Sequence, residues 1–221
     1  MSIKDFVKDY ALTCYTFEGI EEDYFIVRLI YKYMKGRRVL DLGCGPVVPV
    51  TSIFYPNAKE VVAVDRLQAN LDFVRNNSNE LKGVVEKAVK YRRRFLSKIL
   101  INPKVKLVGG DVVKKLNIGK FDSVMALGCF GALKTTDQYK KAINNVYAYL
   151  KHGGTFFILS WIGSVKRPYK FNGPVKDEEI LIPYLKEAGF KIKEFHKTRS
   201  IISEDTKSLG YHEIMWAVTQ K

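Results

Sequence analysis

Cysteine and histidine are scarce in this chain. Its 221 residues include three cysteines (14, 44 and 129), which lie far apart, and three histidines, none of which has the spacing of a zinc-binding motif. An odd number of distant cysteines argues against a disulfide framework, and the histidine pattern argues against a metal site. We therefore expect reduced thiols and no bound metal.

Long apolar runs are also lacking. No stretch approaches the roughly 20 apolar residues of a membrane-spanning helix, and the first residues, MSIKDFVKDY, lack the apolar core of a signal peptide. Low-complexity tracts and internal repeats are missing as well, while a hydrophobic content of 47% suffices for one core. We expect one cytoplasmic, monomeric domain over residues 1–221, with no membrane partner.

Acidic residues are too few to balance the basic ones. The chain has 37 Lys and Arg against 23 Asp and Glu, a net charge of +14. Half of this excess lies between residues 80 and 106, where nine Lys or Arg stand against two Glu. Such a run is usually a solvated helix face, yet it also makes RNA a partner to test, with Arg92, Arg93 and Arg94 contributing.

Two hydrophobic periodicities alternate along the sequence. Period-two runs predict strands at 39–42, 60–64, 105–108, 121–126, 155–159, 191–195 and 213–218. Helical spacing predicts helices at 23–35, 69–76, 80–100, 137–150 and 177–188, with Thr136 capping the fourth and Gly153–Gly154 ending it. The pattern predicts an α/β fold: a Rossmann-like, seven-stranded, mostly parallel sheet with helices on both faces and the last strand antiparallel. We expect residues 1–36 to form an N-terminal segment with a helix, which the resemblance described below makes a lid, and residues 37–221 to form the core, with a basic helical insertion near 79–102.

The stretch DLGCGP, residues 41–46, follows the first predicted strand. Gly43 permits a tight turn, and Gly45 lets a ligand approach the backbone because no Cβ intervenes. Backbone N–H groups near the following helix start favour a polar or anionic part of that ligand. The third glycine of the dinucleotide fingerprint is replaced by Val48, which disfavours a nicotinamide cofactor.

Acidic residues end the next two predicted strands. Asp65 follows EVVAV and could accept two hydrogen bonds from a ribose diol, or it could only cap the next helix. Asp111 in VGGDVV could reach an adenine amino group, or it could be a turn residue. Leu127 and Gly128, after the fourth strand, could pass close to a cofactor. All of these positions lie at the carboxyl ends of predicted parallel strands, where open α/β sheets bind ligands.

Together these motifs resemble the class I methyltransferases that use S-adenosylmethionine and release S-adenosylhomocysteine. LKHGGTFFI, residues 150–158, is similar to the turn that leads into their fifth strand. The resemblance implies cofactor-binding residues at Asp41, Gly43, Cys44, Gly45, Pro46, Asp65, Arg66, Asn70, Asp111, Val112, Leu127 and Gly128.

The N-terminal stretch VKDYALTCYTF resembles the lid of the nicotinamide, phenylethanolamine and thioether methyltransferase group. The resemblance implies that Tyr10 contacts the cofactor carboxylate and that Tyr15 lies beside cofactor and acceptor. Cys14 departs from that pattern, and aromatic residues here could instead only anchor a helix to the core. We expect Tyr15, Tyr24 and Trp161 to be catalytic. Further candidates for the acceptor pocket are Phe130, Ser160, Tyr169 and His212.

Three functions remain open from the sequence. The first is in-line SN2 methyl transfer to a small-molecule amine or heterocyclic nitrogen under an aromatic lid, where orientation supplies much of the rate enhancement. The second is an RNA methyltransferase that binds through the basic 80–106 segment, although the Asp/Asn-Pro-Pro-aromatic element of base amino-group methyltransferases is missing. The third is a non-catalytic module that binds S-adenosylmethionine or associates with RNA.

Overall fold

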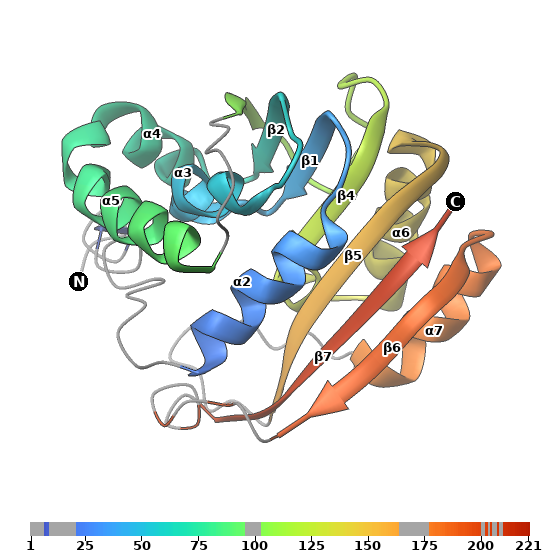
Figure 1. Ribbon diagram of the computed structural model, residues 1–221. Coiled ribbons are helices and arrows are strands. Elements are labelled where there is room, and N and C mark those ends of the chain that lie inside the picture. The colour runs from blue at the N-terminus through green and yellow to red at the C-terminus, as the bar shows by residue number, and fades with distance from the viewer. Residues whose placement is uncertain are drawn as a thin grey trace.

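The computed structural model describes residues 7–8, 21–95, 103–163, 177–199, 202, 204, 207 and 210–221. In these ranges seven strands form one sheet, and helices cover both of its faces (Figure 1). The predicted Rossmann-like α/β fold is confirmed. None of the described helices is both long enough and apolar enough to cross a lipid bilayer.

Each predicted strand is present, with ends that differ by a few residues. The strands are β1 Arg38–Leu42, β2 Glu60–Asp65, β3 Lys104–Gly109, β4 Phe121–Leu127, β5 Leu150–Gly163, β6 Lys191–Thr198 and β7 Tyr211–Gln220. Their order across the sheet is β3-β2-β1-β4-β5-β7-β6. β1 to β5 pair in parallel, whereas β7 runs antiparallel to both β5 and β6. The prediction of an antiparallel last strand is therefore confirmed.

The helices divide into two layers. They are α2 Glu21–Tyr33, α3 Val48–Thr51, α4 Gln68–Asn76, α5 Ser78–Phe95, α6 Thr136–Tyr149 and α7 Asp177–Glu187, with single 3₁₀ turns η1 Gly45–Val47, η2 Ser52–Phe54 and η3 Phe130–Ala132. Buried side chains of α2, α3 and α5 pack with one face of the sheet, and those of α6 and α7 pack with the other. Figure 1 shows α2 in front of the sheet and α6 and α7 behind it.

Two local expectations need correction. Thr135, and not Thr136, caps α6: its backbone is extended, and its Oγ1 accepts the N–H of Gln138 at 3.2 Å. The glycine pair 153–154 lies inside β5 as a bulge, because Leu150 pairs with Phe121 and Thr155 with Ser123. Four residues, 151–154, thus lie opposite the single residue Asp122, and the two glycines help to accommodate this excess.

The basic insertion forms α5 as expected, with one exception among its arginines. Arg92 is 3% exposed, and its guanidinium donates to the backbone oxygen of Ile53. It follows the buried Ala88 by four residues, which puts it on the inward stripe of the helix. The expectation that Arg92 faces RNA is wrong; its neighbour Arg93 is exposed.

Candidate active site

The turn after β1 depends on glycine. Gly43 and Gly45 have φ angles of +66° and +57°, which side-chain-bearing residues rarely adopt. A Cβ at Gly43 would lie 2.6 Å from the sulfur of Cys129. The N–H groups of Gly43 and Cys44 both donate to the oxygen of Val64, at 2.8 and 3.1 Å. The turn is therefore hydrogen-bonded to the end of β2. Because neither Gly43 nor Gly45 has a Cβ, its backbone is accessible at both positions.

Asp65, at the end of β2, joins this turn to the next one. Its Oδ2 accepts the N–H of Gly45 at 2.9 Å, and its Oδ1 accepts the N–H of Leu67 at 2.7 Å. Leu67 is the N-cap residue of α4, and the helix has no side-chain cap, so Asp65 holds the residue that precedes the helix and is not itself the cap that the sequence offered as one of its two roles. Each carboxylate oxygen retains a second lone pair. Hydrogen bonds from a ribose are compatible with this geometry, and that role stays a prediction.

Asp41 is a buried carboxyl group beneath the turn. It is 2% exposed, and its Oδ2 accepts the hydroxyl of Tyr55 at 3.0 Å and that of Thr51 at 3.5 Å. Burial raises the pKa of Asp41 from 3.8 to about 7, against the lowering effect of the Tyr55 hydrogen bond; the charge of Asp65 raises it further. Asp41 therefore changes charge near neutral pH and becomes ionised readily when a cation approaches.

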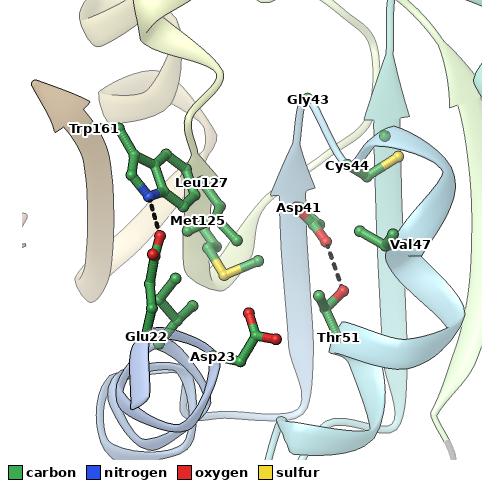
Figure 2. Close-up of a pocket in the computed structure, with 12 residues that line it drawn as sticks. Glu22, Asp23, Asp41, Gly43, Cys44, Val47, Thr51, Met125, Leu127 and Trp161 are labelled. Carbon is green, nitrogen blue, oxygen red and sulfur yellow. Dashed lines mark hydrogen bonds between the residues drawn. The ribbon is translucent and has the colours of Figure 1, made fainter. Parts of the chain in front are cut away.

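A cavity of about 100 Å³ lies at the carboxyl ends of β1, β4 and β5, next to the first turn of α2 (Figure 2). Three carboxylates contribute to its wall, two from α2 and one from β1. Its lining consists of Glu22, Asp23, Ile26, Asp41, Gly43, Cys44, Gly45, Val47, Thr51, Met125, Leu127 and Trp161. This is the edge of the sheet at which the sequence predicts the ligand.

Glu22 and Trp161 meet across this cavity. The indole Nε1 of Trp161 donates to Oε1 of Glu22 at 2.6 Å, and Glu22 is only 5% exposed (Figure 2). The indole lies against Gly128, where a Cβ would come within 2.9 Å of Cζ3 and where φ is +69°. Gly128 therefore lets the indole pack directly on the turn after β4. The side chains of Trp161 and Glu22 fix each other's orientation.

The structure brings only part of the predicted site together. Asp41, Gly43, Cys44, Gly45, Leu127 and Trp161 line the cavity. Outside its lining lie Pro46, Asp65, Arg66, Asn70, Asp111, Val112 and Gly128. The Oδ1 of Asp111 accepts the N–H of Val113 at 3.0 Å, so this residue makes the turn contact that was its alternative role. Tyr10, Tyr15 and Tyr169 lie outside the described residues.

Two aromatic candidates lie away from the cavity. Tyr24 is 40% exposed and packs edge-on against Tyr91, because helical spacing puts it on the side of α2 opposite Glu22 and Ile26. Phe130 is 1% exposed and belongs to the core on the α6 face, where its ring contacts Tyr139. Ser160 is buried outside the cavity lining, and His212 is exposed.

The acidic residues of α2 were not among the site residues predicted from the sequence. Glu22 and Asp23 belong to an acidic first turn with Glu21, a position where carboxylates also stabilise the helix dipole. This run of three acids at the start of an amphipathic helix was the signal in the sequence. Tyr55 carries no comparable signal, because its contact with Asp41 arises only when the chain folds back after α3.

The chemistry of the cavity suits a ligand with positive charge. Glu22, Asp23 and Asp41 supply carboxylates, and Trp161 supplies an aromatic ring that attracts cations. Burial, followed by the charges of Asp41 and Asp65, raises the pKa of the Cys44 thiol, so this cysteine stays neutral and is a poor nucleophile. Within the described ranges, no three His, Cys, Asp or Glu side chains are arranged to hold a metal ion. The sulfonium and ammonium groups of S-adenosylmethionine fit this environment.

Known proteins share both sequence and fold with this chain. A tRNA N(3)-methylcytidine methyltransferase of Schizosaccharomyces pombe is 27% identical over 121 residues, which is 53% of this chain and 34% of that protein. The chain thus spans about a third of that relative's length. Among solved structures, a SAM-dependent methyltransferase of Aquifex aeolicus has a TM-score of 0.62 at 15% identity, over 100% of this chain and 99% of its own. The N-methyltransferase NodS of Bradyrhizobium japonicum, in complex with S-adenosylhomocysteine, has a TM-score of 0.61 at 11% identity, over 100% and 99%.

The model of the methyltransferase domain family matches residues 40–158, from β1 to the middle of β5. This range includes the glycine turn, Asp65 and the end of β4, which carry the motifs found in the sequence. The chain therefore belongs to the methyltransferase domain family, and its cofactor is S-adenosylmethionine.

Proposed function

We propose that this protein methylates a nitrogen of a small-molecule amine or heterocycle. The observation that supports the proposal is the buried carboxylate of Glu22, which accepts the Trp161 indole N–H at 2.6 Å in the cavity that also contains Asp23 and Asp41. An amine reaches an enzyme mostly as an ammonium ion, which carboxylates attract. It must lose a proton before its lone pair can attack a methyl group, and a carboxylate within hydrogen-bond reach can accept that proton.

S-adenosylmethionine supplies an electrophilic methyl group on a positively charged sulfur. The residues of this chain orient the acceptor, take up its proton and exclude water. Trp161 holds the Glu22 carboxylate in one orientation, and Glu22 takes the proton of the acceptor nitrogen. Met125 and Leu127 form an apolar wall that keeps water away from the reacting atoms. Holding the acceptor in line with the reacting bond can lower the barrier by roughly 7–11 kcal/mol.

Other sequence predictions remain part of this proposal. Asp65 binds the ribose, and Asp111 and Val112 approach the adenine from beside the glycine turn. Tyr10 and Tyr15 close over the cofactor as a lid, with Tyr15 next to the acceptor. We do not assign Tyr24 to the acceptor pocket, because its ring lies on the opposite side of α2.

A radiolabelled methyl-transfer screen over amines, pyridines and thioethers tests the proposal, with Glu22→Gln as the diagnostic variant. Gln can still accept the Trp161 N–H but cannot take a proton. For an amine acceptor we expect kcat/KM to fall by about 10²–10⁴, with cofactor affinity nearly unchanged. The matched control is Glu21→Gln, which alters an exposed neighbour and leaves the rate unchanged. Methyl transfer to RNA and to none of the small molecules would reject this assignment.

An RNA methyltransferase is the second candidate. It is favoured by the similarity to a tRNA methyltransferase and by the net charge of +14. Incubating transcribed tRNA with radiolabelled cofactor tests it directly. Incorporation that survives nuclease treatment of the product would count against RNA as the acceptor.

A further inference from the structure

Basic residues follow one another along the edge of the sheet opposite the cavity. Arg37 and Lys59 directly precede β1 and β2, and Lys104 is the first residue of β3. Backbone hydrogen bonds join them: the N–H of Lys59 donates to the oxygen of Arg37 at 2.8 Å, and the N–H of Lys104 donates to the oxygen of Lys59 at 2.8 Å. Lys106 lies two residues farther along β3. We call Arg37, Lys59, Lys104 and Lys106 the basic rim.

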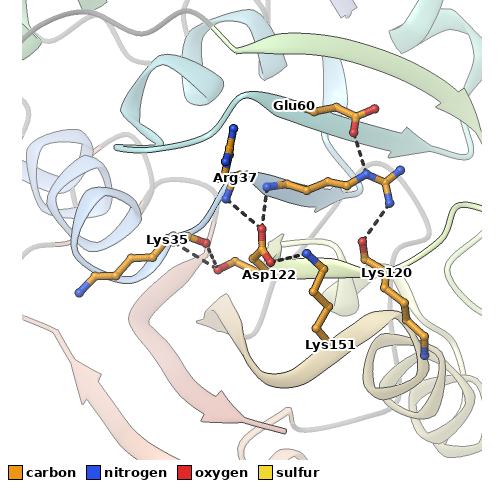
Figure 3. Close-up of polar contacts among 8 residues, drawn as sticks. Lys35, Arg37, Glu60, Lys120, Asp122 and Lys151 are labelled. Atoms are coloured by element: carbon orange, nitrogen blue, oxygen red, sulfur yellow. Dashed lines mark hydrogen bonds and ion pairs between the residues drawn. The ribbon is translucent and has the colours of Figure 1, made fainter.

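The charges of the basic rim are not neutralised by neighbouring carboxylates. All four residues are exposed, and none forms an ion pair with any residue that the structure describes. The two nearby acids have other partners: Glu60 accepts from Arg38 Nε at 2.7 Å, and Asp122 accepts from Lys151 Nζ at 2.6 Å (Figure 3). Asp122 also accepts the backbone N–H of Arg37 at 2.9 Å, while the guanidinium of Arg37 points away from it.

We propose that the basic rim binds the phosphate backbone of a nucleic acid. Neighbouring strands lie about 4.8 Å apart, so three adjacent strand beginnings present cations at intervals that flexible side chains can match to successive phosphates. All four residues are exposed at or near the beginnings of adjacent strands, which suits an extended polyanion. Phosphate contacts of this kind carry no sequence information, so binding is independent of base sequence.

Apolar partners fit this surface poorly. Protein interfaces and membrane-bound helices bury apolar side chains at their centres. In the described part of the chain, the exposed large hydrophobic residues are Tyr24, Leu67 and Phe195, and none of them belongs to the basic rim. A partner that contributes mainly negative charge is therefore favoured.

The outer face of α5 is the basic surface that the sequence suggests for RNA. Its exposed cations are Lys82, Lys87, Lys90 and Arg93. Glu86 lies among them, 3.9 Å from the ammonium of Lys82, and reduces the charge of that face. The acids beside the basic rim, Glu60 and Asp122, instead pair with Arg38 and Lys151, which are not rim residues, and for this reason we assign the binding to the rim. Both sets contain three lysines and one arginine, so they form a matched pair for experiment.

The proposed binding is separable from methyl transfer. β1 has five residues, which at about 3.3 Å per residue separates the rim from the cavity by about 17 Å. Rim variants should therefore leave cofactor binding intact. The inference does not depend on which acceptor the enzyme methylates.

Fluorescence anisotropy with a labelled oligouridylate and a labelled duplex tests the rim across a range of salt concentrations. With four phosphate contacts we expect the logarithm of the association constant to fall against log salt with a slope of about −3 for the single strand. Between about 50 and 200 mM salt, the affinity then drops roughly 50-fold. Cofactor titration calorimetry and thermal unfolding verify that each variant is folded.

Two quadruple variants decide the location. Changing the four rim residues to Gln should abolish most of the slope and weaken binding at about 100 mM salt by two orders of magnitude or more. Changing the four α5 residues to Gln, with the same loss of net charge, should weaken it far less. Equal losses in both variants, loss only in the α5 variant, or no salt-dependent binding by the wild-type protein would each overturn the proposal. Tighter binding to phosphatidylserine vesicles than to either oligonucleotide would do the same.

Discussion

Asp41 provides a sharp test of the cation-binding cavity. The change Asp41→Asn keeps the size of the side chain and an oxygen that can accept the Tyr55 hydroxyl, but it removes a titratable group that is 2% exposed. The pKa of Asp41 is raised from 3.8 to about 7, chiefly by burial. At about pH 6 the ligand-free protein therefore carries a largely protonated Asp41, about nine-tenths by the titration equation.

Binding of a cationic cofactor should expel that proton. A positive charge in the cavity favours the ionised carboxylate and lowers its pKa. At about pH 6, where the amino group of the cofactor stays protonated, each bound S-adenosylmethionine should release close to 0.9 proton. Titration calorimetry in buffers of different ionisation enthalpy measures this number as the slope of the observed binding enthalpy.

Protein stability should respond to pH through the same group. Unfolded Asp41 loses its proton near pH 3.8 and folded Asp41 near about 7. In this window the folded state binds more protons, so the free energy of unfolding falls as pH rises, by about 1.4 kcal/mol per unit and about 4 kcal/mol in full. The Asp41→Asn variant has no group that titrates at this position, so its free energy of unfolding does not fall in this way. Above about pH 7 the ligand-free variant should therefore be more stable than the wild-type protein, and near pH 4 the two should be similar.

The wild-type protein and Asp41→Asn share every other titrating group, so the difference between them reports the contribution of Asp41 alone. In Asp41→Asn we expect a proton release near zero and a flatter stability profile. Two results would refute the reasoning: a wild-type calorimetric slope of zero at about pH 6, or the same slope in both proteins. Either would mean that Asp41 does not sense the cofactor charge.

Two further changes probe the packing around the site. Arg92→Ala should destabilise the protein by about 1–3 kcal/mol, because it leaves the buried oxygen of Ile53 without its donor. Arg93→Ala, at the exposed next position, should destabilise it by less than about 0.5 kcal/mol. Chemical denaturation measures both free energies of unfolding, and equal losses would contradict the buried placement of Arg92. Gly128→Ala puts a Cβ 2.9 Å from the Trp161 ring at a φ of +69°, so we expect a loss of about 1–2 kcal/mol from backbone strain and weaker cofactor binding by calorimetry. Unchanged cofactor affinity in a folded Gly128→Ala protein would show that the indole does not help to form the cofactor site.

The glycine turn and the strand ends beside it could be predicted from the sequence because local rules determine them. The turn at Gly43 and Gly45 requires left-handed backbone, and only glycine adopts it readily, so the motif itself encodes the geometry. Strand periodicity placed Asp41 and Asp65 at strand ends, and parallel pairing then brings those ends to one edge. No long-range packing had to be known.

The residues that sequence reasoning misplaced depend on contacts between distant segments. Tyr24 and Glu22 are two positions apart, and which of them faces the cavity is decided by how α2 lies on β4 and β5. Arg92 has the most polar of side chains on the apolar stripe of α5, a placement that makes sense only once the oxygen of Ile53 is seen within reach. When basic residues are only counted along the sequence, Arg92 and Arg93 are equally good candidates for contacting RNA.

Contacts between distant segments also change which basic surface is the best candidate for binding a nucleic acid. Along the sequence, positive charge is concentrated between residues 80 and 106, which directs attention to α5. In the sheet, Arg37 and Lys59 come from other segments and lie beside Lys104 because parallel strands begin at a common edge. Electrostatic attraction acts between groups that are close in space, within about 8–10 Å at physiological salt. A nucleic acid is therefore attracted by the basic rim, whose residues lie close together in space. The two quadruple Gln variants compare the basic rim with the exposed cations of α5 at an equal loss of charge.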